Sequence, residues 1–543
     1  MKYIKYFNAV IFIMMIVIAG CTKDLNLEPI DPNTETSDKV FKTISDYESA
    51  LAKIYASYAI SGQRGGGGGL PDIQGIDENF GNYLRQFFGL QELPTDEAIM
   101  AWDDATIKNF HWHTWAPNDV FITALYSRIF YSITLANEFV RISNDAMGSF
   151  SGSDETNLEY YQAEARFLRA FSYWHAIDLF GNVPFITEAD EPGDFYPSQI
   201  SREDLFAYIE SELLDIESKL GPAGPGAFDY AAANQAAAWM LLAKLYLNAE
   251  VYTGTARYGD AITQLEKVIA AGYSLDPVYE NVFRADNNTS PEIIYPIAFD
   301  GQNIQQYGGM TFILHASNGG GMPLNGIDGG WGGIRTIQDF VSVFDVSESD
   351  FSTADPQFTG IADKRGMFYF DPDNWQWNVT NVGTFTHGIG VTKFKNISSD
   401  GSEAPNAHPT FVSTDFPVFR LADAYLMYAE AVLRGGGGNN GTALGYVNAL
   451  RERAYGDNSA NINSNELTLD FILDERGREL YWECHRRTDL IRFGKFTGGD
   501  YVWEWKGNVQ AGTATPAYRD LYPIPANDLN SNPNLEQNTG YAK

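Results

Sequence analysis

The stretch AAANQAAAWMLLAKLYLNAE occupies residues 231–250, and YGDAITQLEKVIAA follows it at residues 258–271. In both stretches the apolar residues recur at the spacing of one face of an α-helix. Only a short polar connection separates them, and such a connection places two consecutive helices antiparallel to each other. The sequence therefore predicts a helical hairpin in this region.

The hairpin resembles a tetratricopeptide unit. The residues at matching positions are Trp239, Ala243 and Tyr246 on the first helix, Ala261 and Leu265 on the second, and Pro277 beyond it. A second pair spans residues 416–433 and 442–454, with Tyr425, Tyr428, Ala429, Ala443 and Val447 at the corresponding places. The repeat is degenerate, so one match alone is weak evidence. Two pairs together predict a mainly α-helical repeat scaffold in which each unit packs on its neighbour.

Further helices are predicted over residues 119–142, 163–180 and 202–219. By contrast, residues 273–415 are rich in glycine, asparagine, aspartate and aromatic residues, with short β-type runs at 293–295 and 391–394. A structureless loop of that length is uncommon unless it is functional. We therefore expect a loop-rich, ligand-binding lobe with short strands at 273–415, interleaved between helical parts at 43–272 and 416–543.

The charge balance limits the classes of ligand. The 543 residues include 37 Lys and Arg against 70 Asp and Glu, which gives a net charge of −33 and a pI near 4.5. Nucleic acid binding requires a basic face, so this composition argues against it. It equally disfavours anionic polysaccharides and anionic lipid headgroups. Two cysteines are too few for a disulfide framework.

The N-terminus predicts a lipid anchor. Lys2 and Lys5 precede an apolar run at residues 9–18, and Ile18-Ala19-Gly20-Cys21 resembles the bacterial lipobox, in which the cysteine is acylated. Residues 1–20 then form a signal peptide, and the polar, Pro-containing residues 21–42 form a tether. The alternative is a plain secretory signal with an incidental cysteine.

Familiar enzyme signatures are missing. The chain has no His-Glu-x-x-His, no Cys-x-x-Cys and no Gly-x-Ser-x-Gly motif. His111 and His113 flank Trp112, but no carboxylate cluster lies near them in the sequence, so packing is favoured over a metal site. No catalytic residue and no cofactor are expected.

Two other features allow a chemical and a structural interpretation. The pairs Asp96-Glu97 and Asp103-Asp104 have the composition of a glycosidase site, but adjacent carboxylates are common in so acidic a chain. A solvated or capping role is therefore favoured for both pairs. Cys484 lies in a predicted helical stretch, where packing is favoured over reactivity.

Several sequence blocks form a recognisable set: EARFLRA (164–170), DLFGNVP (178–184), RLADAYLMYAEA (420–431), DERGREL (474–480) continuing through Glu483 and Arg486 to DLIRFG (489–494), YPIP (522–525) and NLEQN (534–538). They resemble the SusD/RagB family of Bacteroidetes outer-membrane nutrient-binding lipoproteins. The blocks occur in order and cover essentially the whole mature chain. The charged residues in them lie in amphipathic helices, where carboxylate–guanidinium pairs are expected to lock the helices together. These are Glu164, Arg166, Arg169, Glu430, Glu475, Arg476, Glu479 and Arg486.

The resemblance implies a function. It implies a helical body anchored at the outer leaflet of the outer membrane and facing the cell surface. It also implies a SusC-type TonB-dependent transporter as partner, and a non-enzymatic role in capturing a neutral glycan, with a glucan favoured. Two alternatives stay open: a peptide-binding, RagB-like protein of the same family, and a surface hydrolase.

A neutral glycan offers apolar C–H faces, which suit flat aromatic rings, and hydroxyl groups, which suit amides, carboxylates and arginine. Two loop segments offer such residues, 95–104 and 307–333. By resemblance to starch-binding relatives, the ligand site carries over to Trp102, Arg85, Tyr307 and Trp331, with Asp103 where those relatives place a polar contact. Packing remains the alternative for the rings, and an ion pair for Arg85.

Two more clusters are less specific. Trp375 and Trp377 are candidates for a second patch or for a transporter contact. Asp300 and Gln302 resemble oxygen ligands for calcium, but two ligands are too few to predict a site. Trp112, Trp115 and His113 are assigned to packing, because they precede a predicted helix start.

Overall fold

The computed structural model describes residues 40–62, 70–77, 79–190, 193 and 195–542. Two compact units are distinguished, residues 1–47 and residues 48–543. In the first, the backbone N–H groups of Lys42 and Thr43 donate to the Asp46 carboxylate at 3.0 and 2.7 Å, where α3 (Ile44–Ala59) begins. The predicted signal peptide, Cys21 and the tether up to residue 39 lie outside the described residues.

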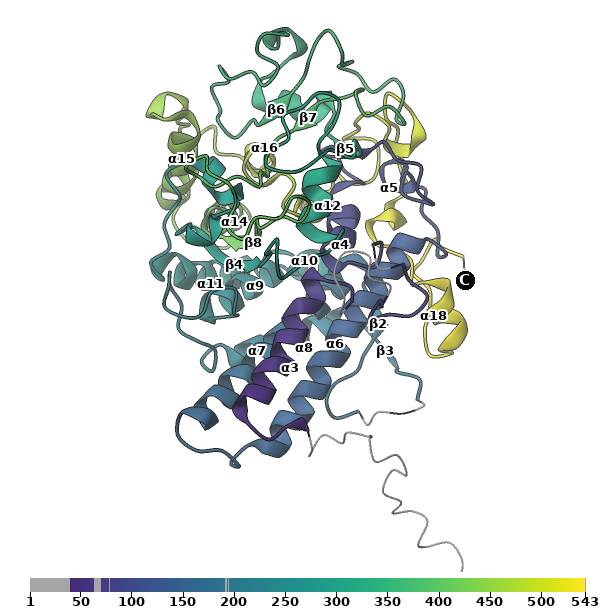
Figure 1. The fold of residues 1–543 in the computed structure, drawn as a ribbon, viewed down its shortest axis with the longest axis vertical. Helices are drawn as coiled ribbons and strands as arrows, with labels where there is room; N and C mark the ends of the chain where they lie inside the picture. Colours follow the sequence, from purple (N-terminus) through teal and green to yellow (C-terminus); the bar gives the residue numbers. More distant parts are fainter. Residues whose placement is uncertain (1–39, 63–69, 78, 191–192, 194, 543) are drawn as a thin grey trace, which may run out of the picture. The chain divides into compact units, whose positions relative to one another are not determined.

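Helices dominate the second unit (Figure 1). They are α4 (Tyr83–Glu92), α5 (Asn109–Trp112), α6 (Val120–Ala146), α7 (Ser153–Leu179), α8 (Arg202–Ile216), α9 (Gln235–Leu247), α10 (Ala249–Thr253), α11 (Tyr258–Ala270), α12 (Gly309–Ala316), α13 (Gln338–Val341), α14 (Leu421–Leu433), α15 (Asn440–Tyr455), α16 (Leu469–Leu480), α17 (Arg486–Arg492) and α18 (Ala526–Ser531). Among the described residues, none of the helices is both long and apolar enough to span a bilayer.

The predicted helical pairs form and pack in series. Helix α9 packs on α11, α11 on α14, and α14 on α15, so two hairpins far apart in the sequence are neighbours in space (Figure 1). Helix α9 begins later than predicted, because the Asn234 side chain caps it by accepting the N–H of Ala237 at 3.1 Å. The prediction of a mainly α-helical, tetratricopeptide-like scaffold with an interleaved loop-rich lobe is confirmed.

The strands are short and paired. They are β1 (Ile99–Met100) with β5 (Ile334–Arg335), β2 (Val183–Pro184) with β3 (Gln199–Ile200), β4 (Ile293–Ile297) with β8 (Phe416–Arg420), and β6 (Phe368–Tyr369) with β7 (Gly390–Val391), all antiparallel. The predicted extension of a helix over residues 416–420 is wrong. Phe416–Arg420 pairs with β4 as a buried strand, and helix α14 starts only at Leu421.

The β4–β8 pair explains how the loop-rich lobe is inserted. Residues 298–415 leave the scaffold after β4 and return to it at β8, so the pairing of these two strands holds the two ends of the excursion together. Within the lobe the chain also forms α12 and α13, which the sequence analysis did not predict. The domain boundaries at residues 272 and 415 stay a prediction.

A group of charged side chains is buried where α15, α16, β8 and the lobe meet, and we call it the ionic cluster. Its members are Lys393, Arg365, Arg420, Arg453, Glu292, Glu475, Glu479 and Glu483. Arg420 contacts Glu292 and Glu479 at 2.7 Å each and Glu483 at 2.6 Å, and every side chain in the cluster is at most 4% exposed.

Pairing decides the charge state of these groups. Burial alone would raise the pKa of Glu475, but Arg365, Arg478 and Arg451 outweigh it and lower that pKa to about 2. The expectation that charged family-motif residues lock the packing is therefore confirmed for this cluster. Glu164 is the exception, because its buried carboxyl contacts the Tyr55 hydroxyl instead of a guanidinium.

Candidate functional site

Strands β1 and β5 bring the two predicted ligand segments together. Ile99 pairs with Arg335 and Met100 with Ile334, and the N–H of Ala101 donates to the carbonyl of Gly333 at 2.8 Å, which extends the ladder by one step. Trp102 follows directly after this step on one strand, and Trp331 precedes it on the other. The antiparallel register therefore places two residues 229 positions apart side by side.

Trp102, Tyr307 and Trp331 form what we call the aromatic surface. The Trp102 and Trp331 ring centroids are 6.4 Å apart with planes at 40°, and those of Tyr307 and Trp331 are 6.3 Å apart at 50°. Trp331 is 36% exposed, and the other two rings are half-buried. Because neighbouring ring planes are inclined by 40° and 50°, the three rings form a curved array and not a flat one.

Glycines permit the close approach of the two tryptophans. Gly332 has φ of +61°, in the region that favours glycine, and so turns the chain between Trp331 and β5. A Cβ added at Gly333 would lie 2.7 Å from Cε2 of Trp102. The indole N–H of Trp102 donates to the Trp331 carbonyl at 3.2 Å, which fixes one ring against the backbone of the other.

Tyr307 is positioned by an asparagine that the sequence analysis missed. Asn82 caps α4 by accepting the N–H of Arg85 at 3.0 Å, and the same oxygen accepts the N–H of Gly309 at 2.9 Å. Its amide group donates to the carbonyl of Ala59 at 2.6 Å. The turn that carries Tyr307 is thereby tied to α3 and α4. An N-cap pattern before a helix is the only sequence signal for such a residue.

Arg85 lies beneath the aromatic surface. It is 6% exposed, its guanidinium lies 4.3 Å from the centre of the Phe312 ring, and it donates to the carbonyl of Asn79 at 2.9 Å. Burial lowers the pKa of Arg85 to about 10, although Asp104 and Asp77 act in the opposite direction. Phe312 in turn meets Trp102 edge-on, with centroids 5.9 Å apart at 70°. Arg85 therefore supports the layer on which Trp102 rests.

Asp103 is at the rim of the site. Its side chain is 87% exposed and forms an ion pair with Lys108. A carboxylate and an ammonium group are thus both within reach of solvent beside Trp102, and such groups can accept and donate hydrogen bonds to hydroxyls.

The preferred interpretation of Asp96-Glu97 as solvated or capping is wrong. Both are buried, and Asp96 forms an ion pair with Arg486 at 2.7 Å. Glu97 accepts the N–H of Trp482 at 3.0 Å. Burial raises the pKa of Glu97 well above its ordinary range, and the neighbouring Glu92 carboxylate acts in the same direction. These carboxyl groups hold the segment before β1 against the turn after α16.

Cys484 is buried, as the packing interpretation predicted, but it is not helical. It has φ of +66° in the turn between α16 and α17, and burial raises the pKa of its thiol well above the ordinary value. His113 is also buried, with Nε2 lying 2.7 Å from the carbonyl of Pro94. Among the described residues, no group of His, Cys, Asp and Glu side chains is arranged to hold a metal ion.

Trp375 and Trp377 do not form a surface patch. They are 6% and 8% exposed, and the Trp375 indole N–H donates to the carbonyl of Gly320 at 2.8 Å. One Asp300 oxygen accepts the N–H groups of Gln302 and Asn303, and the other accepts the Asn406 amide at 2.6 Å. Asp300 therefore organises a turn.

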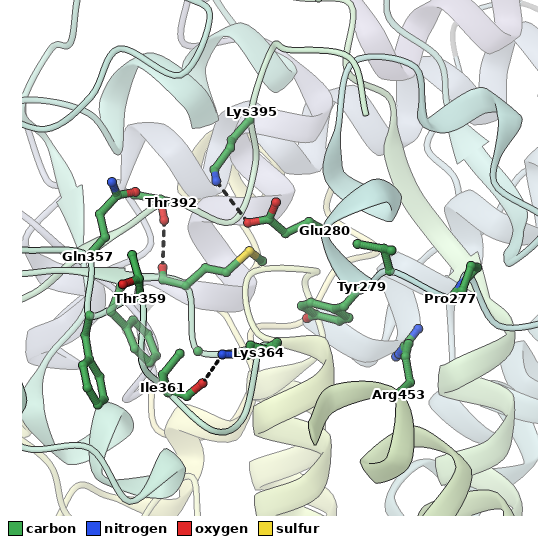
Figure 2. A pocket seen from close by; sticks show the side chains of 15 residues that line it. Pro277, Tyr279, Glu280, Gln357, Thr359, Ile361, Lys364, Thr392, Lys395 and Arg453 are labelled. Carbon is green, nitrogen blue, oxygen red and sulfur yellow. Dashed lines mark hydrogen bonds and ion pairs between the residues drawn. The ribbon is translucent and has the colours of Figure 1, made fainter. Parts of the chain in front are cut away.

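A cavity of about 450 Å³ lies elsewhere, beside the ionic cluster (Figure 2). In Figure 2 Lys395 points to Glu280, at 3.2 Å, and Lys364 donates to the carbonyl of Ile361. Of the aromatic side chains that line the cavity, Tyr279 and Phe368 are buried and Phe358 is half-buried. The cavity therefore differs from the aromatic surface, where neighbouring rings are open to solvent.

Comparison with known proteins places the chain in a family. Residues 291–541 match the model of the SusD family. Over its full length the chain is 34% identical to the starch-binding protein SusD of Bacteroides thetaiotaomicron, covering 99% of each sequence. The chain belongs to the SusD family. It is also 28% identical to the SusD-like protein P25 of Formosa agariphila, covering 76% of this chain and 78% of that one.

Solved structures of SusD relatives share the fold. A SusD homologue from Bacteroides thetaiotaomicron superposes with a TM-score of 0.70 at 19% identity, covering 94% of this chain and 99% of the other. The surface glycan-binding protein A of the same species, solved in complex with laminarihexaose, gives 0.67 at 19% identity, with coverage of 92% and 100%.

Proposed function

We propose that this protein captures a neutral glucan on the aromatic surface without reacting with it. The observation that carries the proposal is the meeting of Trp102, Tyr307 and Trp331 from two distant segments, with exposed or half-buried rings. Aromatic rings offer flat apolar faces that suit the C–H faces of sugar rings, at little conformational cost.

The tilt of the rings favours an α-linked glucan. Planes at 40° and 50° to each other follow a curved chain better than a straight one, and α-linked glucans are curved. The relative that is 34% identical to this chain over its full length is named a starch-binding protein, which supports the same class of ligand. A few stacking contacts and exposed hydrogen bonds correspond to micromolar to millimolar affinity, roughly −8 to −4 kcal/mol.

Capture rather than hydrolysis is supported by the state of the carboxyl groups near the site. Asp96 is fixed by Arg486 and Glu97 by Trp482, and both are buried, so neither faces the aromatic surface as a free acid or base. Asp103 is paired with Lys108 at the rim. In this account Asp103 and Lys108 contribute hydrogen bonds to sugar hydroxyls.

The proposal includes a place in the cell. The lipobox-like sequence ending at Cys21 supports acylation there and display on the outer membrane. Membership of the SusD family supports delivery of the captured glucan to a SusC-type TonB-dependent transporter. Loss of the Cys21→Ala variant from the membrane fraction of cells would support the lipid anchor. Co-purification of the parent protein with a SusC-type transporter would support the delivery step.

Affinity gel electrophoresis tests the binding claim. The purified protein should be retarded in a gel that contains soluble starch, and Trp102→Ala combined with Trp331→Ala should restore the mobility seen without starch. Trp239→Ala is the matched control, because Trp239 is a half-buried tryptophan on α9, outside the aromatic surface. It should be retarded like the parent protein.

Four results would contradict the proposal. The first is unchanged retardation of the double variant, and the second is the absence of retardation of the parent on every glucan tested. Binding of peptides instead of glucans would favour the RagB-like alternative. Release of reducing sugar from starch by the purified protein would favour the hydrolase.

A further inference from the structure

Trp331 rests on a histidine that the sequence analysis did not single out. His315 lies near the end of α12, and its side chain is 0% exposed. Its ring is stacked on that of Trp331, with centroids 4.5 Å apart and planes at 24°. The backbone carbonyl of His315 also accepts the N–H of Trp331 at 2.7 Å. One residue therefore supports both the ring and the backbone of the most exposed tryptophan in the site.

Both nitrogens of the His315 imidazole face carbonyl oxygens. Nδ1 lies 2.6 Å from the carbonyl of Gly329, and Nε2 lies 2.8 Å from that of Thr410. A carbonyl oxygen only accepts hydrogen bonds, and a neutral imidazole carries one N–H. A neutral ring would therefore set one bare nitrogen against a carbonyl oxygen at hydrogen-bond distance. The imidazolium, with two N–H groups, can donate to both.

The two carbonyls belong to the two segments that hold the aromatic surface. Gly329 is two residues before Trp331 in the same turn. Thr410 is next to Phe411, whose ring packs on that of Tyr307 with centroids 5.2 Å apart. Protonated His315 thus joins the turn that carries Trp331 to the segment behind Tyr307.

Charged and titratable groups lie on each segment that neighbours this ring. Asp328, in the turn of Gly329, places a carboxylate oxygen 3.9 Å from Nδ1. On α4, which packs against α12, the cation of Arg85 lies on the ring of Phe312. In the segment of Thr410, His408 uses Nδ1 to accept the N–H groups of Thr410 and Phe411 at 3.1 and 3.2 Å.

The other titratable side chains of α4 point to different partners. Tyr83 contacts His175 at 2.6 Å, and Glu92 accepts the N–H of Cys484 at 2.5 Å. The carboxylate of Asp328 is therefore the anion that the structure places beside His315, and its second oxygen accepts the Thr410 hydroxyl at 2.7 Å.

We propose that His315 is a positioning residue whose protonated form holds Trp331 in the ligand-binding arrangement, so that glucan affinity falls when His315 loses its proton. This inference rests on the proposed function. Deprotonation of His315 removes one of its two hydrogen bonds to carbonyl oxygens, and it removes the positive charge beneath the Trp331 indole. Both losses weaken the attachment of the turn that carries Trp331.

The direction of the pH effect follows from this assignment. The binding-competent state holds the proton, so raising the pH weakens binding. An imidazole ordinarily changes its charge between about pH 5 and 8, and affinity should therefore be higher at about pH 5.5 than at about pH 8.5. The expected ratio is about tenfold, the factor that one hydrogen bond to a charged group supplies.

The test combines calorimetry with nuclear magnetic resonance on the purified full-length protein. Dissociation constants for maltoheptaose are measured at both pH values. Resonances of isotope-labelled imidazole and indole nitrogens are followed over the same range, with His315→Gln assigning the His315 signals. Both His315 nitrogens should carry protons at the lower pH, and the Trp331 indole signal should shift as one proton is lost. His315→Gln should bind weakly at both pH values, because the amide is uncharged and carries both of its N–H groups on one nitrogen, whereas the two carbonyl groups face different nitrogens of the His315 ring.

His387→Gln is the matched control, because His387 is a half-buried histidine outside the site, with Nδ1 at 3.1 Å from Thr380 and Asn381. It should keep the tenfold ratio. The inference would be overturned if only one of the two His315 ring nitrogens carried a proton at the lower pH, whatever the binding result. It would also be overturned if the Trp331 indole signal, or the glucan affinity, did not change as His315 loses that proton. If the parent binds no glucan at any pH, the proposed function fails, while the two sets of resonances still decide whether His315 positions Trp331.

Discussion

The ionic cluster and the aromatic surface, which lie in the same compact unit, differ in how their side chains are satisfied: the first pairs buried charges, and the second presents aromatic rings to solvent. In the ionic cluster, charged side chains that are at most 4% exposed satisfy one another at distances such as 2.7 Å between Arg420 and Glu479. In the aromatic surface, three rings remain open or half-open to solvent and are held by glycine turns and backbone hydrogen bonds. In the first region most of the charged groups are already paired with one another, although Nε of Arg453 has no hydrogen-bond partner among the described residues, whereas the second region presents ring faces to solvent.

This difference separates the residues that identify the family from those that we expect to bind. Glu475 and Glu479 belong to the blocks that resemble the SusD/RagB family, and they are buried in ion pairs. Trp102 and Trp331 lie outside those blocks, in irregular segments of the chain. The blocks that suggested the family thus lie in the buried interior, whereas the residues that we propose to bind ligand lie in irregular segments, the part of a fold that commonly carries binding residues.

The largest expected effect comes from opening the ionic cluster. Arg420→Met should destabilise the fold by about 3–5 kcal/mol, because it leaves buried carboxylates without a partner. The glucan affinity of the protein that remains folded should not change. Urea unfolding followed by tryptophan fluorescence measures the stability, and calorimetry measures the glucan affinity.

Arg257→Met is the matched control for that experiment. Arg257 also contacts two carboxylates, Glu210 at 2.9 Å and Asp260, but its side chain is 33% exposed. An exposed pair contributes at most about 1 kcal/mol, so this variant should unfold nearly like the parent. Equal losses of unfolding free energy in the two variants would show that burial does not determine how much the ion pairs of the cluster stabilise the fold.

A second, smaller effect concerns Glu164, the motif carboxyl group that has no guanidinium partner. Burial raises its pKa from 4.5 to about 7, although the hydrogen bond from Tyr55 lowers it. The folded state therefore holds a proton that the unfolded state has lost, and stability falls as the pH rises from about 4.5 to about 7.

Glu164→Gln should reduce the loss of stability between about pH 5 and pH 8 by about 1–3 kcal/mol, because the amide does not ionise. Urea unfolding at the two pH values measures this. Other buried acids also contribute to the parent's pH dependence, among them Asp415, whose pKa burial raises to about 6. The comparison is therefore between variant and parent, and an identical pH dependence in the two would contradict the assignment.

The smallest expected effect concerns the position of the Trp102 ring relative to Trp331 in the aromatic surface. Gly333→Ala places a methyl group 2.7 Å from the Trp102 ring, which must move away from Trp331. Glucan affinity should fall about tenfold, or about 1.4 kcal/mol, with little change in stability because Trp102 is half-buried. Gly329→Ala, in the turn that carries Trp331, is the control, because no atom lies within 4 Å of the added carbon. Equal affinities for the two variants would mean that the position of Trp102 does not matter.

The sequence was informative where periodicity is strong. Helices α6, α7, α8, α9 and α11 were predicted because their buried faces repeat at helical spacing, and the loop-rich character of the lobe was predicted from its content of glycine and polar residues. Residues 416–420 were misassigned because the run FPVFR precedes a helix without a break, and its strand partners are distant in sequence, with Phe416 paired to Ile297 and Arg420 to Ile293. Short-range patterns carry no information about such pairing.

The site shows the same limit. Trp102 and Trp331 were selected from the sequence, but their contact depends on the β1–β5 register, which no local pattern specifies. Asn82, Phe312 and His315 were missed, because each acts through a residue that is distant in sequence. The burial of Asp96 was missed for the same reason, since its partner Arg486 is distant in sequence and lies in α17.

A crystal structure of the protein with maltoheptaose tests the central claim most directly. The account predicts sugar rings stacked on Trp102 and Trp331, with Tyr307 alongside and the ionic cluster unchanged. Maltoheptaose bound in the cavity beside Lys364 and Lys395, with the aromatic surface uncovered, would contradict it.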